Sequence, residues 1–142
     1  MALPDRLQLE VATPKELVLE AAPTSVTVPS VSGEFGVLPL HLPLLTALKA
    51  GVLQYNVDGK KHVAAVGPGF VEAGPEKVLL LTDQYATPDE IDADAEQAEL
   101  AAAEAELKAL GGSQTGSEWI EASRRADWAR AQLQALAIAR AL

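Results

Sequence analysis

Between Arg6 and Asp83, apolar and polar residues alternate in short segments. In the first segment Leu7, Leu9 and Val11 alternate with polar residues, which is the period of a strand that buries one face. Glycine and proline turn signals separate further segments of this kind, KELVLEA, TSVTVPS, VLQYNV, KHVAAV, GFVEA and KVLLLTD. Many short strands with frequent turns predict a small β-sandwich or barrel.

The pattern changes at Thr87, where TPDE begins a stretch with helical period. Thr87 is suited to the N-cap, Pro88 to the first helical position and Glu90 to the third position of a capping box. We therefore expect a helix that begins here and runs to Leu110.

Gly111 and Gly112 end this helix, and a second helix is expected from about Ser117 almost to the C-terminus. The short connection GGSQTGS favours two antiparallel helices. The sequence thus predicts a mainly β N-terminal sandwich, residues 1–85, followed by a C-terminal antiparallel α-helical hairpin, residues 86–142.

Small apolar residues recur in both helices with spacings of three and four, which places them on one seam of each helix. The expected seam of the first helix is Ile91, Ala95, Ala98, Ala102, Ala105 and Ala109. That of the second is Trp119, Ala122, Ala126, Ala129, Leu133 and Leu136. A buried alanine methyl contributes only about 0.8 kcal/mol, whereas a buried leucine contributes about 1.5–3 kcal/mol. Such a hairpin is weakly held, and we expect it to be a movable element.

The chain has 142 residues, a formal net charge of −9 and no cysteine. The negative charge argues against nucleic acid as a partner, because binding phosphates requires clustered lysine and arginine. Without cysteine there are no disulfides, thiolate metal sites or cysteine nucleophiles. Charged residues interrupt the first twenty positions and every long apolar stretch, so we expect neither a signal peptide nor a membrane span.

No catalytic or metal-binding constellation is recognisable. His41 and His62 are the two histidines, and neither has a partner at a catalytic spacing. The acidic run between Asp89 and Glu106 follows helical spacing and lacks the glycine turn of a calcium loop. We therefore predict no catalytic residues, no metal site and no cofactor.

Charge divides unevenly between the two helices. Residues 86–110 contain eight acidic residues and one lysine, a charge of −7, whereas residues 111–142 contain three acidic residues and four arginines, a charge of +1. These arginines either form a surface for an acidic partner or pair with the first helix, and their pattern does not separate the two possibilities. They are Arg124, Arg125, Arg130 and Arg140.

The stretch GEFGVLPLHLPLLTALKAGVL is apolar, yet Pro39 and Pro43 prevent a regular helix. We expect strand and loop here, with leucines that are only partly interior and that meet a partner. These are Leu38, Leu40, Leu42, Leu44 and Leu45.

This stretch resembles the signature of the epsilon subunit of rotary F-type ATP synthases, Gly-x-x-Gly-x-x-Pro-Gly-His-x-Pro-Leu-Leu-Thr. The resemblance extends to LQLEVATPKELV near the N-terminus, to GPGFVEA followed by VLLLTD, and to the helical hairpin. One residue departs from the pattern: Leu40 stands where the family commonly has glycine before the histidine.

The resemblance implies a ten-stranded sandwich that rests on the gamma subunit and on the membrane ring of c subunits. It implies a subunit without an active site, peripheral to the membrane, which couples proton flow to ATP synthesis. Partner contacts would come from Glu34 at the ring, His41 at gamma, and Phe35 and Gly36 between them. The absence of a transit peptide favours the cytoplasmic face of a bacterial plasma membrane.

The resemblance also implies that the hairpin is a regulatory arm that restrains ATP hydrolysis. Gly111 and Gly112 would be the hinge between its helices. Its basic residues, Arg124, Arg125, Arg130 and Arg140, would face the acidic alpha and beta subunits of the catalytic head. The alternative hypothesis is a free-standing β-sandwich binding module that self-associates through its hairpin.

Some bacterial members bind ATP through an Ile/Leu-Asp-x-x-Arg-Ala motif. Here the sequence is Ile91-Asp92-Ala93-Asp94-Ala95-Glu96, with Ala95 in place of the arginine. Because the first helix has no arginine and a charge of −7, it would repel a triphosphate, and we expect ATP binding to be absent or very weak.

Overall fold

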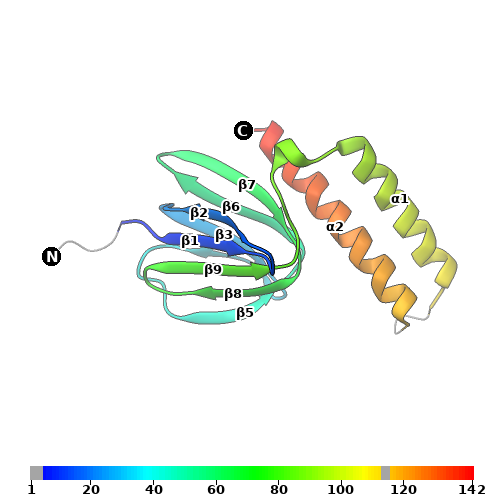
Figure 1. Ribbon diagram of the computed structural model, residues 1–142, viewed down its shortest axis with the longest axis horizontal. Helices are drawn as coiled ribbons and strands as arrows, with labels where there is room; N and C mark the ends of the chain where they lie inside the picture. Colours follow the sequence, from blue (N-terminus) through cyan, green and yellow to red (C-terminus); the bar gives the residue numbers. More distant parts are fainter. Residues whose placement is uncertain (1–4, 113–115) are drawn as a thin grey trace.

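The computed structural model describes residues 5–112 and 116–142. Ten strands form one strongly curved sheet, and two helices follow it (Figure 1). The strands are β1 (Gln8–Ala12), β2 (Leu17–Ala21), β3 (Ser25–Ser30), β4 (Gly33–Val37), β5 (Leu44–Leu48), β6 (Gly51–Val57), β7 (Lys60–Val66), β8 (Gly69–Ala73), β9 (Lys77–Thr82) and β10 (Tyr85–Ala86). The helical elements are the 3₁₀ turn η1 (Pro88–Glu90), α1 (Ala93–Leu110) and α2 (Ser117–Arg140).

The strand order is β10-β7-β6-β3-β5-β8-β9-β1-β2, with β4 paired to β3. The sheet wraps around one core, so the predicted mainly β sandwich followed by a helical hairpin is confirmed. The pairing of β1 with β9 is parallel, whereas the other pairings of the described strands are antiparallel.

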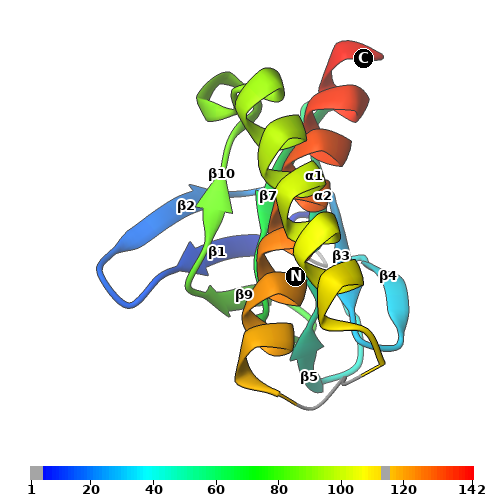
Figure 2. The ribbon, with the colours of Figure 1, turned by 90° about the vertical axis from the view of Figure 1, so that its right-hand side faces the viewer.

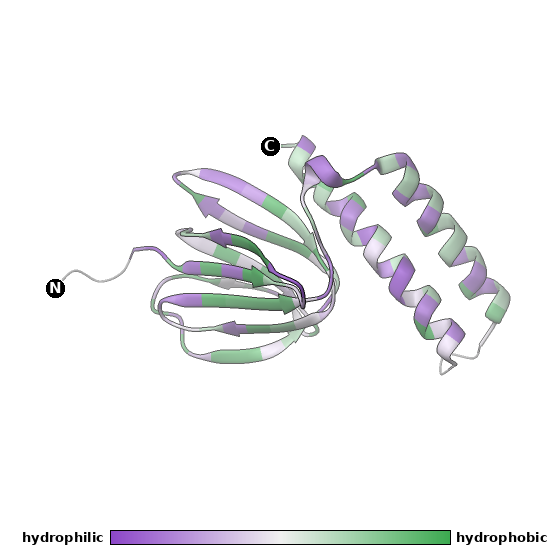
Figure 3. Ribbon diagram, in the orientation of Figure 1, coloured by the Kyte–Doolittle hydropathy of each residue, from purple (hydrophilic) through white to green (hydrophobic). Residues whose placement is uncertain are grey.

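Alternation along the strands fills the core as expected. Leu7, Leu9 and Val11 are buried, and the register places Leu9 beside Val78 and Val11 beside Leu80. Figure 3 shows apolar and polar residues alternating along the strands. Since side chains of a strand point alternately to its two faces, every second residue of β1 enters the core.

The first α-helix begins later than predicted. The Glu90 carboxylate accepts hydrogen bonds from the Thr87 N–H at 3.0 Å and from its hydroxyl at 2.6 Å, but this cap encloses only η1. The chain is extended at Ile91, and Asp92 then caps α1 by accepting from the Ala95 N–H at 3.2 Å. The sequence thus holds two N-cap residues only five positions apart, Thr87 and Asp92, and it is Asp92 that begins the α-helix.

The helix α2 lies between the sheet and α1, against β6 and β7 (Figures 1 and 2). On its sheet side, Ala131 and Ala135 pack with Val52, Val63 and Ala65. The predicted seam of the second helix is confirmed at its core positions, which are buried: Ala122, Ala126, Ala129 and Leu136.

The predicted seam of the first helix is wrong at its alanines, although its first residue, Ile91, is half-buried and packs at the interface between α2 and the sheet. Its alanines at positions 95, 98, 102, 105 and 109 are exposed, and Ala103 is the buried residue of α1. Leu100, Leu107 and Leu110 are half-buried on the same side as Ala103. Alanines occur all around this helix, so their spacing does not mark a face, whereas the larger leucines do.

Candidate functional site

The segment of residues 38–45, here called the leucine loop, comprises the β4–β5 connection and the first two residues of β5, and it carries five exposed leucines. Leu42 is 80% exposed and Leu45 is 70% exposed. The expectation that these leucines are only partly interior is therefore confirmed. Several large exposed apolar residues in one short segment are typical of a protein interaction site.

Phe35 of β4 and His41 of the leucine loop lie close together, with ring centroids 6.5 Å apart. Phe35 is half-buried and packs against the core, so it supports the loop from below. Gly36 pairs with Thr27 in the β3–β4 ladder. The structure thus brings Phe35, Gly36 and His41 into one region.

Glu34 points to the opposite face of β4 from Phe35, because successive side chains of a strand alternate. It is exposed and lines a pocket of about 220 Å³ together with Lys49 of the β5–β6 connection and Gln134 of α2. Of the four predicted contact residues, Glu34 is therefore the one that lies toward the hairpin.

A second apolar surface was not found from the sequence. Ala47 is paired with Phe70, Phe70 with Leu81, Leu81 with Ala12, and Ala12 with Leu17. These five side chains, here called the apolar row, cross β5, β8, β9, β1 and β2 on the outer face. Phe70 is 59% exposed, and Leu81 and Leu17 are each nearly half exposed. This surface could have been recognised in the sequence from Phe70 in GFVEA and Leu81 in KVLLLTD, which are apolar residues at outward positions of their strands.

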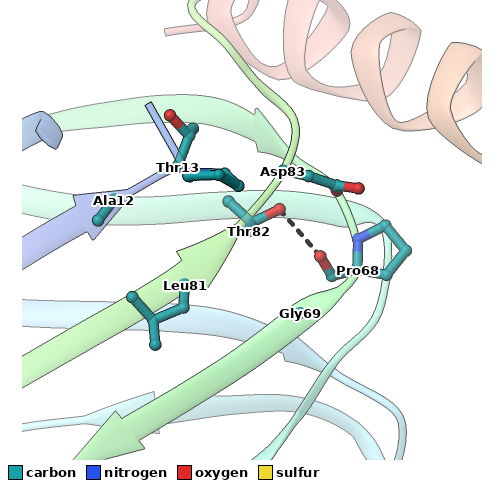
Figure 4. Close-up of a pocket in the computed structure, with 8 residues that line it drawn as sticks. Ala12, Thr13, Pro68, Gly69, Leu81, Thr82 and Asp83 are labelled. Carbon is teal, nitrogen blue, oxygen red and sulfur yellow. Dashed lines mark hydrogen bonds between the residues drawn. The ribbon is translucent and has the colours of Figure 1, made fainter. Parts of the chain in front are cut away.

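A pocket of about 410 Å³ adjoins the apolar row near the end of β9 (Figure 4). Ala12 and Leu81 belong to both features. The Thr82 hydroxyl donates to the Pro68 carbonyl at 3.0 Å and fixes the rim of the pocket. The pocket therefore opens beside the β9–β1 part of the apolar row, not at either end of it.

The hairpin arginines fall into two pairs. Arg125 lies 2.6 Å from Glu106 and 3.2 Å from Glu99, and Arg130 lies 3.3 Å from Glu104. Arg124 and Arg140 take part in none of the ion pairs between described residues, and both side chains are exposed. Two of the four arginines therefore hold α1 against α2, and the other two face solvent.

A pocket of about 310 Å³ lies where the hairpin meets the segment after β9. Two arginines, Arg124 and Arg125, line it beside Trp128 and Gln84. Four acidic residues outnumber these arginines: Asp83, Glu96, Glu99 and Glu121. The exposed Ala95 is not among the lining residues.

Gly111 ends α1 with φ +67°, and its N–H donates to the Lys108 carbonyl at 3.2 Å. Gly112 follows it and is exposed, while residues 113–115 of the predicted connection lie outside the described residues. Neither helix, over the part of the chain that the structure describes, has the length and apolar character needed to cross a bilayer.

Comparison with known proteins identifies the family. Residues 6–88 match the family described as ATP synthase, Delta/Epsilon chain, beta-sandwich domain. The chain is 42% identical over 106 residues to the ATP synthase epsilon chain of Geobacter sp. (strain M21), covering 75% of this chain and 77% of that one. It is 35% identical over 130 residues to that of Synechococcus sp. (strain WH7803), covering 91% and 95%. The chain belongs to the ATP synthase epsilon-chain family.

The fold agrees with this membership. A chain in the cryo-EM structure of the Euglena gracilis mitochondrial ATP synthase, determined with OSCP, F1 and c-ring, superposes with a TM-score of 0.79. The alignment covers 99% of this chain and 84% of that one at 22% identity. The expectation of an F-type ATP synthase epsilon subunit, a rotor subunit, is confirmed, and the free-standing binding module is not favoured.

The backbone conformation at Leu40 gives a physical reason why the epsilon signature has glycine at this position. Leu40 has φ +72°, a left-handed conformation that glycine adopts without strain and leucine does not. A glycine before the histidine is thus suited to the turn that the leucine loop makes here.

Proposed function

We propose that this chain is a non-catalytic subunit of the central stalk, whose sandwich binds the gamma subunit and the c-ring. The hairpin, residues 86–142, is in this proposal an arm that leaves the sandwich and restrains ATP hydrolysis by contact with the alpha and beta subunits. The complex would lie at the cytoplasmic face of a bacterial plasma membrane. The alanine-built interface between α2 and the sheet carries the proposal.

That interface is weak for its length. Alanines make up four of the six buried residues of this cluster, and its larger apolar residues are Val52 and Val63 with the half-buried Ile91, Trp128 and Ile138 around them. Each buried alanine methyl contributes about 0.8 kcal/mol, so these four positions hold the helix less strongly than leucines would. The helices themselves retain their hydrogen bonds when they leave the sheet.

Two surfaces of the sandwich are suited to stalk partners. The leucine loop with His41 offers an apolar surface for gamma, and the apolar row extends apolar contact across the outer face. Glu34 offers an exposed carboxylate for the c-ring. Phe35 and Gly36 support these contacts from within β4.

The hairpin arginines support a two-step role. Arg124 and Arg140 are exposed while the hairpin is docked, and either can meet an acidic surface without rearrangement. Arg125 is bound to carboxylates of α1 and becomes free only when the two helices separate, whereas Arg130 loses Glu104 on separation but keeps Asp127 of its own helix at 3.1 Å. Gly111 and Gly112 are the proposed hinge for that separation, because glycine accepts a wide range of backbone angles.

The deciding experiment measures ATP hydrolysis by the cognate ATPase complex from which this subunit has been removed. Either the whole chain or a version ending at Ala86 is added back, and binding of each is measured in parallel. We expect both to bind and only the whole chain to suppress turnover. Equal turnover with both bound would refute the inhibitory arm, and failure of both to bind would refute the stalk assignment.

A further inference from the structure

A line of carboxylates runs beside the apolar row on the outer face of the sheet. Strand register places Leu45 beside Glu72, Glu72 beside Leu79, Leu79 beside Glu10, and Glu10 beside Glu20. On β5, β8, β9 and β1 each of these residues lies two positions from a member of the apolar row, so both lines share one face at a spacing of about 7 Å. The three glutamates, Glu10, Glu20 and Glu72, are here called the acidic row.

The acidic row is only partly neutralised. Lys77 of β9 lies 2.9 Å from the Glu10 carboxylate. Neither Glu20 nor Glu72 has an ion pair within residues 5–112 and 116–142, and both are exposed. The hairpin packs against β6 and β7, so these two carboxylates are left for other contacts.

The charged residues that border this face do not reverse its sign. Arg6, just before β1, lies 2.6 Å from Asp58 and is neutralised by it. Four acidic residues and two lysines make up the other charged positions at the ends and turns of these five strands, namely Asp5, Glu16, Glu76, Asp83, Lys15 and Lys49. The apolar row therefore lies in a negative surrounding.

The position of Glu20 is unfavourable within the chain itself. Glu20 of β2 is paired directly with Glu10 of β1, and like charges at directly opposed positions destabilise a sheet. Lys77 approaches Glu10 from β9, on the far side from β2. The second carboxylate thus costs stability in the isolated chain, whereas a partner that carries positive charge would turn the same carboxylate into a favourable contact.

The two rows together specify the chemistry of that partner. A second copy of this chain would bring its own carboxylates against either the acidic row or the apolar row. The first arrangement repels, and the second removes the hydration of the carboxylates without compensation. A membrane with anionic lipids would also be repelled. A protein surface with apolar residues beside lysine or arginine satisfies both rows.

We propose that the outer face of the sandwich binds a basic, amphipathic segment of a stalk partner, whose apolar side chains cover the apolar row and whose cations meet Glu20 and Glu72. The inference rests on the proposed function, which supplies protein partners in the central stalk, and it names the chemistry that one of them presents to this face. Phe70, which is 59% exposed, is the apolar anchor of the contact.

Binding is measured on the immobilised ATPase complex that lacks this subunit, at low and at high salt. The full-length test variant is Glu20→Gln/Glu72→Gln. The matched control, Asp94→Asn/Glu118→Gln, changes the net charge equally at two exposed positions of the hairpin. We expect the test variant to bind about tenfold more weakly at low salt, and this difference to shrink at high salt because salt screens the contact. The control should bind no more weakly than the unaltered chain.

Glu20→Gln alone gives a second readout. In the isolated chain it removes the repulsion with Glu10, so we expect the melting temperature to rise by about 1 °C or more. Binding to the complex should nevertheless become about threefold weaker at low salt. A purely structural role would move stability and binding in the same direction. A lower melting temperature for Glu20→Gln would refute the repulsion.

The remaining outcomes separate this inference from the proposed function. If the unaltered chain binds the complex and the double variant binds equally well at both salt concentrations, the basic partner is refuted while the proposed function stands. If the unaltered chain does not bind the complex, both are refuted. Cosedimentation with vesicles that contain phosphatidylglycerol, or a dimer in sedimentation velocity that Phe70→Ala dissociates, would show a different occupant and refute the inference.

Discussion

The guanidinium of Arg125 in α2 lies 2.6 Å from the carboxylate of Glu106 in α1. The same guanidinium is 3.2 Å from Glu99, so one residue of α2 is bound to two carboxylates of α1. These groups are partly exposed, and each pair contributes modestly in water. In a hairpin whose apolar seam is built largely from alanine, such pairs are a sizeable share of what holds the helices together.

Replacing Arg125 with glutamine should loosen α1 from α2. Because the pairs are partly exposed, we expect a loss of about 0.5 kcal/mol, which corresponds to roughly twofold faster amide exchange in α1. Hydrogen exchange measures this at low salt, and the difference should shrink at high salt. Arg140→Gln on the same helix is the control. Identical exchange for both variants would show that the Arg125 pairs do not hold the hairpin.

Enlarging Ala135 should detach the hairpin from the sheet. Ala135 is fully buried against β6 and β7, so a leucine there has no space and should destabilise docking by about 1–3 kcal/mol. The half-buried Trp128 packs at the same interface, and its fluorescence should shift to the red. Ala137 lies on the exposed side of the same helix, so Ala137→Leu should change neither the docking of the hairpin nor the fluorescence of Trp128. Equal spectra for the two variants would contradict this prediction.

Gly69 should not tolerate a side chain. A Cβ at this position would lie 1.9 Å from the Leu81 carbonyl oxygen, which is backbone of the neighbouring strand and cannot move aside. We expect Gly69→Ala to lower the free energy of unfolding by about 3 kcal/mol in urea titrations. At Gly36 the nearest atom would be 4.0 Å away, and Gly36→Ala should cost less than about 1 kcal/mol. Similar losses at both positions would count against the register of β8 and β9.

Stability should depend on Glu90 at neutral pH but not in acid. Hydrogen bonds from the Thr87 side chain and backbone lower the pKa of Glu90 from its usual 4.5. A lowered native pKa means that the carboxylate stabilises the fold above pH 4.5 and that this contribution is lost as the pH falls through the native pKa. Glu90→Gln should thus cost about 0.5 kcal/mol at pH 7, a small effect because the group is exposed, and progressively less as the pH falls through the native pKa. The free energy of unfolding is measured by urea titration at pH 7 and in acid, with Glu76→Gln as the control. If Glu90→Gln lowers it equally at both pH values, the charge of the Glu90 carboxylate is not the cause.

ATP should not bind the isolated chain with micromolar affinity. The pocket beside Trp128 has four carboxylates against two arginines, so the phosphates of ATP would enter a negative field. Calorimetry should show no saturable heat at micromolar ATP. Glu96→Arg would relieve the repulsion, and any gain of binding should occur in that variant. Micromolar binding by the unaltered chain would overturn the expectation.

Most of the sheet was predictable because its information is local. Alternation in LQLEVA and the turn residues specify strands without knowledge of their neighbours, and two prolines suffice to exclude a helix from the leucine loop. The apolar row was not predictable in the same way. Phe70, Leu81 and Ala12 lie side by side only through pairings between distant segments.

The hairpin illustrates a different limit. Charge totals left open whether the arginines pair with the first helix or meet an acidic partner, and which arginines pair depends on how α1 is rotated about its axis. That rotation could not be inferred from alanines, which occur on every side of α1, and the leucines at 100, 107 and 110 were the informative residues. Leu40 was noticed as a departure from a pattern, and its positive φ supplies the physical reason.

The parallel pairing of β1 with β9 joins segments about 70 residues apart and has a consequence for biosynthesis. Closing so long a loop is entropically costly, and the first strand has no β9 neighbour until that segment has left the ribosome. By then the hairpin is the next part of the chain to emerge. If the sheet closes at that stage, as we expect, α2 meets paired strands when it emerges, and its alanine face is not exposed to unpaired ones.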